Sequence, residues 1–202
     1  MDRSDKYKWT IIYSDHNNKF IHLDYLTRSN PDSQILLADI SNNYDPKFCW
    51  RNGDFLIRQW LQKYIDIVHH NNIALLEWDV LVSQTLPSIQ VDGLIGKNVK
   101  YRDKNPKWPW FKEIDRLDNY SQYSIGVAPL GVLFLNKECL EILLDSEFDD
   151  LYQKDIFSEL RLPTILNSRN IKISSYFLPD VEWYQMPVKT NPGIYHSVKT
   201  KQ

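Results

Sequence analysis

The stretch Asn72-Ile-Ala-Leu-Leu-Glu-Trp-Asp-Val80 decides the fold that this sequence predicts. Its apolar part, residues 73–76, is short and partly β-branched, which is typical of a strand buried on both faces of a sheet. The run ends in Glu77, Trp78 and Asp79. Because side chains alternate along a strand, we expect Glu77 and Asp79 to point the same way at its carboxyl end, where ligands of open α/β sheets bind.

Two carboxylates in this position suit a hard divalent cation such as Mn²⁺ or Mg²⁺, which takes oxygen ligands and bridges carboxylates to phosphate groups. We therefore expect Glu77 and Asp79 to hold a metal ion that in turn holds a nucleotide diphosphate. The spacing alone fits equally well two solvated acids at a strand end with no ligand.

The bulk composition bounds the class of protein. The chain has 202 residues, of which 43% are hydrophobic and 25% charged, as in a soluble globular domain with a core. A net charge of −2 argues against a nucleic-acid partner. The sequence has no long apolar run and no signal-peptide core near Met1, so we expect no membrane segment and a cytoplasmic location. Cys49 and Cys139 lack metal-ligand spacing and are predicted to be free thiols.

Aromatic and glycine contents bear on the ligand. Seven Trp and twelve Tyr provide flat apolar faces with a polar edge, which suit stacking on sugars or bases. Glycine occurs only six times, and neither of the common Gly-rich phosphate loops is present. A bound phosphate must therefore be held by a metal ion or by side chains.

Strands and helices alternate on the amino-terminal side. Residues 8–13 and 34–38 read as strands and residues 54–68 as a helix with one apolar stripe, so the chain up to Val80 predicts the order β-β-α-β. This order favours an α/β fold with a mainly parallel central sheet flanked by helices.

Two polar residues of this half have open interpretations. Asp39 ends the second strand, where a turn or cap acid is the simpler interpretation. Arg58 lies one helical turn after Asp54 and either forms a surface ion pair with it or reaches a phosphate.

The carboxyl-terminal side is less regular. Residues 104–111 set Trp108 and Trp110 among prolines, which predicts a stiff extended loop that forms an acceptor platform or closes the edge of the core. A second apolar strand is expected within 126–135. Further expected features are an N-cap at Asn136, a helix capped by Ser158 with Glu159 in its first turn, and a late strand within 171–177. No repeat or composition shift marks a second domain.

These pieces together resemble the GT-A class of nucleotide-sugar glycosyltransferases. The resemblance implies a single GT-A-like, Rossmann-like domain over residues 1–202, with a nucleotide-binding half of about 1–80 and an acceptor half of about 81–202. Glu77-Trp78-Asp79 stands where the class has an Asp-x-Asp metal motif. Glu77 departs from that pattern, because the class has Asp at this position. Asp79 matches the pattern and is therefore the better supported metal ligand.

The resemblance also implies roles for residues that are distant in sequence. His196 matches a late histidine that completes the metal site, although a lone histidine is otherwise a surface or core residue. Glu159 matches an acid that faces the acceptor, although it also suits a helix N-terminus. Trp108 and Trp110 are the expected acceptor contacts. The residues expected to contact the nucleotide are Ser14, Asp39, Arg58, Trp78 and Lys199.

The implied activity is a metal-dependent transfer of a hexosyl or deoxyhexosyl group from a UDP-sugar to a hydroxyl of a glycan acceptor. Asp79 and Glu159 are the expected catalytic residues and Mn²⁺ or Mg²⁺ the cofactor, with retaining and inverting stereochemistry both open. Within the class the chain looks most like an N-terminal glycosyltransferase domain of a multidomain chlorella-virus protein, which implies the host cytoplasm. The alternatives are a non-catalytic carbohydrate-binding module and a nucleotidyltransferase, although no Gly-rich basic loop follows Tyr13.

Overall fold

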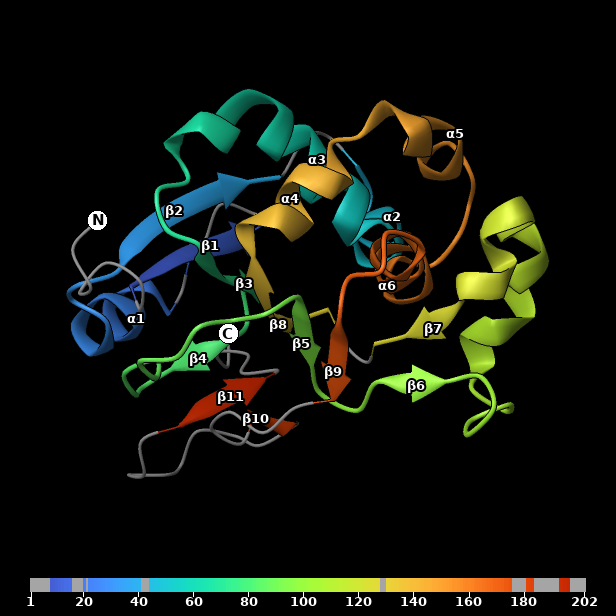
Figure 1. The fold of residues 1–202 in the computed structure, drawn as a ribbon. Coiled ribbons are helices and arrows are strands. Elements are labelled where there is room, and N and C mark those ends of the chain that lie inside the picture. Colours follow the sequence, from blue (N-terminus) through green and yellow to red (C-terminus); the bar gives the residue numbers. More distant parts are fainter. Residues whose placement is uncertain are drawn as a thin grey trace.

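A six-stranded sheet runs through the middle of the molecule (Figure 1). The computed structural model describes residues 8–15, 20, 22–40, 44–127, 130–175, 181–183 and 193–196. The strands lie in the order β2-β1-β3-β8-β5-β9. Their bounds are Trp9–Asp15 for β1, Gln34–Asp39 for β2, Asn72–Glu77 for β3, Leu94–Gly96 for β5, Val132–Asn136 for β8 and Ile173–Ser175 for β9.

The sheet is mainly parallel, as the sequence predicts. Strand β1 pairs in parallel with β2 and β3, and β5 pairs in parallel with β9. Strand β8 is antiparallel to both of its neighbours, β3 and β5, and is therefore the one strand of this sheet that runs against the others. The predicted α/β class, with helices flanking such a sheet, is confirmed.

Helices and short strands complete the described part of the chain. The α-helices are α1 Leu23–Ser29, α2 Pro46–Arg51, α3 Gly53–Tyr64, α4 Lys137–Leu143, α5 Asp149–Tyr152 and α6 Ser158–Ser168. The 3-10 helices are η2 Ile65–Ile67, η3 Pro109–Tyr123 and η4 Ser146–Phe148. A small sheet joins β10 Val181–Trp183, β11 Ile194–His196 and β4 Leu81–Val82, and β6 Lys100–Tyr101 pairs with β7 Ile125–Gly126. None of these helices is long and apolar enough to cross a membrane.

The two faces of the sheet bury separate cores, which explains the unbroken apolar run of β3. Ile73 and Leu75 pack into the larger core, which also holds side chains of α3, α4 and α6. Ala74 and Leu76 pack into the opposite core with Leu26 of α1 and Val82 of β4. Because both faces are covered, alternate residues of β3 need not be polar.

Several local predictions hold. Asn136 caps α4, since its side chain accepts a hydrogen bond from the Cys139 backbone N–H. Cys49 and Cys139 are both free and buried. The late strand is found, although shorter than predicted, and residues 176–177 of it lie outside the described part of the chain.

Three local predictions are wrong. The extended loop expected over 104–111 consists instead of turns up to Trp108. Pro109 then begins η3, where the first turn of a helix needs no N–H from its first residue. Ser158 is the first residue of α6 rather than its cap, which is Phe157. The Asp54–Arg58 ion pair, one of the two interpretations of Arg58, is replaced by pairs that each residue forms with a side chain distant in sequence.

Candidate active site

Three predicted metal ligands converge at the carboxyl end of β3. Glu77 is the last residue of the strand and Asp79 follows it in a turn closed by a hydrogen bond from the Val80 N–H to the Glu77 carbonyl. His196 ends β11, whose register on β4 places Tyr195 opposite Leu81. The strand pair thus brings His196 back to the turn, although more than a hundred residues separate them.

The three side chains are close enough to bind one ion. His196 Nε2 lies 3.3 Å from Asp79 Oδ1 and 3.6 Å from Glu77 Oε2, and one ligand atom from each residue lies within 4.8 Å of the other two. A side chain at Gly131 has no room here, because a Cβ would lie 2.5 Å from His196 Nε2. The absence of a side chain at Gly131 therefore lets the backbone of the β8 side approach the imidazole.

The electrostatics of the cluster favour a positive charge. Burial lowers the pKa of His196, but the carboxylates of Asp79 and Glu77 outweigh burial and raise this pKa to about 9. A site that stabilises a protonated imidazole between two acids also suits a divalent cation, for which the imidazole gives up its proton. The two carboxylates are the oxygen donors that Mn²⁺ and Mg²⁺ prefer, and the imidazole adds one nitrogen donor.

The cluster opens into a cavity of about 510 Å³. Glu159, in the first turn of α6, lines the same cavity as the three candidate ligands. Burial, and then the negative charge of Glu77, raise the pKa of Glu159 to about 8, while a backbone hydrogen bond with Leu130 and the charge of His196 act in the opposite direction. A carboxyl group with a pKa near neutrality in such a cavity has the proton affinity that a general base needs.

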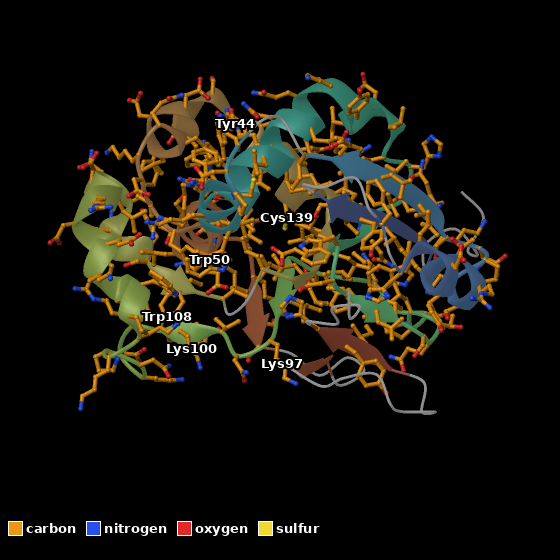
Figure 2. The ribbon with its side chains drawn as sticks, turned by 180° about the vertical axis from the view of Figure 1, so that it is seen from behind. Tyr44, Trp50, Lys97, Lys100, Trp108 and Cys139 are labelled. Atoms are coloured by element: carbon orange, nitrogen blue, oxygen red, sulfur yellow. The ribbon has the colours of Figure 1, made fainter. Side chains whose placement is uncertain are left out.

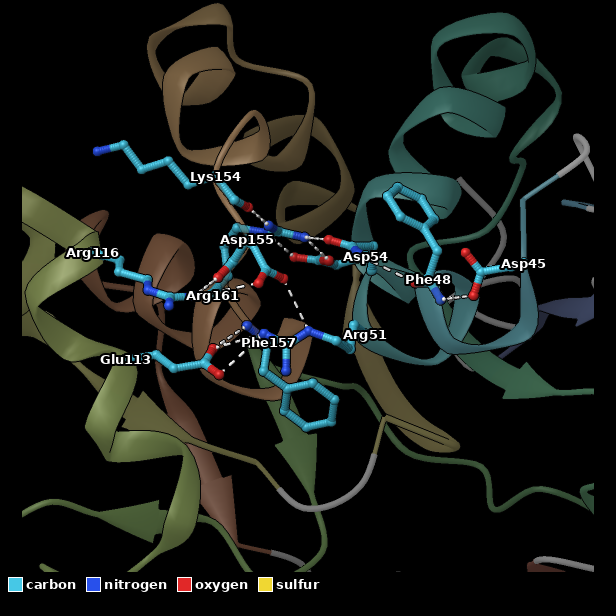
Figure 3. A network of polar contacts seen from close by, with 11 residues as sticks. Asp45, Phe48, Arg51, Asp54, Glu113, Arg116, Lys154, Asp155, Phe157 and Arg161 are labelled. Carbon is cyan, nitrogen blue, oxygen red and sulfur yellow. Dashed lines mark hydrogen bonds and ion pairs between the residues drawn. The ribbon is translucent and has the colours of Figure 1, made fainter.

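A buried polar network holds α6 in place (Figure 3). The guanidinium of Arg161 donates to both carboxylate oxygens of Asp54, at 2.6 and 2.9 Å, and both side chains are fully buried. The Glu113 carboxylate accepts hydrogen bonds from the Phe157 N–H at 2.8 Å and from Arg51 at 3.0 Å. Because Glu159 lies between Phe157 and Arg161, the network fixes the residues on both sides of it.

Two of the five expected nucleotide contacts reach the cavity. Ser14 lines it and donates a hydrogen bond to the Leu76 carbonyl at 3.1 Å. Trp78 lines it too, and its backbone carbonyl accepts a hydrogen bond from Tyr13 Oη at 2.6 Å. These bonds tie both residues to the ends of β1 and β3.

The two other expected nucleotide contacts that the structure describes, Asp39 and Arg58, do not line this cavity. Asp39 ends β2 as an exposed residue, and only its neighbour Ile40 is part of the lining. Arg58 is buried, with its guanidinium donating to the Leu143 carbonyl at 2.7 Å and pairing with Asp149, so it joins α3 to the region of η4 and α5. Lys199 lies outside the described residues.

The two expected acceptor residues are separated. Trp110 lines the cavity, whereas Trp108 packs edge-on to Phe111, with ring centroids 4.9 Å apart, and covers Gly126. Sequence reasoning missed Trp50, which lines the cavity from α2, and the Asp54–Arg161 pair. No local pattern could reveal this pair, because its members are 107 residues apart.

Comparison with known proteins gives structural likenesses only. No family model matches the chain, and no curated protein matches its sequence. The glycosyltransferase GlyE of Streptococcus pneumoniae TIGR4 is similar with a TM-score of 0.49 and 17% identity, over 96% of this chain and 55% of GlyE. The galactosyltransferase LgtC, solved with donor and acceptor sugar analogues, gives 0.42 and 14%, over 79% of this chain and 70% of LgtC.

A glycosyltransferase involved in glycosylation of the major capsid of PBCV-1 gives a TM-score of 0.37 and 14% identity, over 67% of this chain and 63% of that chain. These structural neighbours are all glycosyltransferases. Their TM-scores lie below 0.5 and their identities below 25%, so these likenesses assign no function to the chain.

Proposed function

We propose that this chain is a metal-dependent glycosyltransferase that moves a sugar from a nucleotide-diphosphate sugar, a UDP-sugar in the first instance, to a hydroxyl of a glycan acceptor. One observation carries the proposal: Glu77, Asp79 and His196 face the same cavity as Glu159, at the carboxyl end of a central strand. Open α/β sheets bind their ligands at this edge.

The candidate ligands Asp79, His196 and Glu77 would hold Mn²⁺ or Mg²⁺. When bound, the cation supplies Lewis-acid stabilisation of the negative charge that develops on the diphosphate as the bond to the sugar breaks. Ser14 and Trp78, held at the ends of β1 and β3, are the proposed nucleotide contacts.

Glu159 is the residue that contacts the acceptor hydroxyl in this proposal. If the reaction inverts the configuration, its ionised carboxylate takes the proton of the acceptor hydroxyl. If the reaction retains the configuration, Glu159 orients that hydroxyl by a hydrogen bond. Burial beside Glu77 raises the pKa of Glu159 to about 8, and a cation on Glu77 and Asp79 would offset the repulsion from Glu77 and favour the ionised form. The anomeric configuration of the product, read by NMR, separates the two roles.

The test is a thermal-shift panel of UDP-, GDP- and dTDP-sugars with and without Mn²⁺, on the wild type and on Asp79→Asn. A ligand at 100 times its Kd stabilises by about 2.7 kcal/mol, which corresponds to roughly 5–10 °C for a chain of this size. We expect a shift that requires both one nucleotide sugar and Mn²⁺ and that is lost in Asp79→Asn. Asp66→Asn, at an exposed acid of η2, is the matched control and should keep the shift.

The alternatives predict different results. A carbohydrate-binding module retains glycans but shows no shift with any nucleotide sugar. A nucleotidyltransferase releases pyrophosphate from UTP and a sugar 1-phosphate. Either result, without a metal-dependent shift by a nucleotide sugar, contradicts the proposed function.

A further inference from the structure

An indole at the cavity is more exposed than any other large hydrophobic side chain of the described residues. Trp50, near the end of α2, is 55% exposed, and it lines the cavity (Figure 2). Tryptophan is highly buried in most proteins, since its large apolar surface is costly to leave in water. The exposed surface of Trp50 belongs to the same cavity as Glu159, the candidate catalytic group.

Other aromatic rings hold Trp50 in a fixed orientation. Its ring meets Trp110 edge to face with centroids 5.6 Å apart, and it packs on Phe157 at 4.8 Å. Trp110 and Phe157 in turn lie 4.1 Å apart, and Phe157 is only 1% exposed. Arg51 and Lys112 approach the Trp110 ring, at 5.9 and 5.5 Å from its centroid. Cations thus contact Trp110, whereas much of Trp50 remains accessible.

The platform, defined as Trp50, Trp110 and Phe157, lies next to the candidate base. Phe157 is the N-cap of α6, and Glu159 follows it in the first turn of that helix. The proposed nucleotide contacts, Ser14 and Trp78, instead come from the ends of β1 and β3. The cavity therefore combines an acidic cluster at the strand ends with an aromatic wall on the α6 side.

We propose that Trp50 forms an acceptor subsite, in which the indole face stacks on the apolar face of a pyranose ring of the acceptor glycan. This assignment rests on the proposed function. A pyranose offers C–H groups on a face and hydroxyls around its rim, so it matches a flat indole beside a carboxyl group. Trp110 and Phe157 support the ring, Glu159 meets the hydroxyl at the rim, and Trp108 takes no part.

The experiment compares Trp50→Ala, Trp50→Phe and Tyr25→Ala with the wild type. Tyr25 is a matched control, because it is 50% exposed on α1 and does not line the cavity. Binding to an array of pyranosides is measured without nucleotide, the acceptor KM is measured for the glycans retained, and UDP with Mn²⁺ is followed by thermal shift. Alanine replacement of aromatic residues that stack on nucleic-acid bases costs roughly 5- to 150-fold in affinity, and we expect a similar loss here.

The expected result is a loss of glycan affinity and a raised acceptor KM in Trp50→Ala, partial retention in Trp50→Phe, and wild-type values in Tyr25→Ala. The thermal shift with UDP and Mn²⁺ should stay unchanged in all three. The subsite is overturned if Trp50→Ala retains the glycans as the wild type does, or if the wild type retains none. A loss of the nucleotide shift in Trp50→Ala would assign the indole to the base and equally overturn it. Absence of that shift in the wild type would refute the proposed function instead.

Discussion

Replacing Glu159 by Gln is expected to stabilise the metal-free protein at alkaline pH. The unfolded chain ionises this carboxyl at its ordinary pKa of 4.5, whereas burial and the charge of Glu77 raise the folded pKa to about 8. Between these two values the folded state binds more protons than the unfolded state, so the contribution of Glu159 to stability falls as pH rises and is constant above about pH 8. Glutamine fills the same space and never ionises.

The size of the effect follows from the two pKa values. At about 1.4 kcal/mol per pH unit, the rise from 4.5 to about 8 corresponds to a cost on the order of 5 kcal/mol at pH 8.5. For a chain of this size that is roughly 10–20 °C in Tm. Near pH 4.5 the wild type and Glu159→Gln should be about equally stable, because the carboxyl is then largely protonated in the folded state and near half-protonated in the unfolded state.

The assay is urea unfolding in the presence of EDTA at pH 5, 7 and 8.5. EDTA is needed, because a cation on Glu77 and Asp79 would offset the repulsion that helps to raise the Glu159 pKa. Glu141→Gln, at an exposed acid of α4, controls for the loss of a negative charge and should change stability little at any of these pH values. Equal stability of the wild type and Glu159→Gln at pH 8.5 would refute the placement of Glu159 in a poorly solvated cavity.

Two further predictions concern the core. Arg161→Met leaves the buried carboxylate of Asp54 without its partner, so we expect a loss of about 3–5 kcal/mol in urea unfolding. The double variant Asp54→Leu with Arg161→Met should recover most of it, and equal losses in both would contradict this reading of the pair. Burial raises the pKa of Cys139 to about 12 from 9.0, so its folded state keeps the proton while the unfolded thiol ionises. The free energy of unfolding should therefore fall between pH 9 and 12 by up to about 1.4 kcal/mol per pH unit, and by less in Cys139→Ala. Urea unfolding at pH 8 and 10.5 measures this difference. An identical pH dependence in the variant would count against the raised pKa of Cys139.

Local sequence patterns predicted the sheet well, because its strands are decided by nearest neighbours. The apolar run of β3 is unbroken because helices and the small sheet cover both faces, and that pattern is visible in six residues. The cap at Asn136 is visible for the same reason, since its side chain bonds an N–H three residues along. Features that depend on contacts within one helix or strand can be predicted without knowledge of the rest of the chain.

Predictions failed where a distant partner competes with a near one. Arg58 and Asp54 are one helical turn apart, yet Asp54 pairs with Arg161 and Arg58 with Asp149. A buried guanidinium must have its donors satisfied: Arg58 finds acceptors among the residues around η4, and Arg161 of α6 donates to the Asp54 carboxylate of α3. Only the tertiary structure reveals which helices meet, so the role of Arg58 as a helix tie was not visible in the sequence.

Two acidic residues of the cavity, Asp54 and Glu159, differ in how their charge is compensated. Asp54 and Glu159 both line the cavity and both are largely buried. Asp54 is matched by both arms of the Arg161 guanidinium, so its charge is compensated where it stands. For Glu159, burial and the charge of Glu77 raise the pKa. The backbone hydrogen bond with Leu130 and the charge of His196 lower it by less, so the pKa stays at about 8. Folding alone would be better served by a neutral residue at 159, and the proposed function gives this carboxyl a cation and an acceptor hydroxyl as its partners.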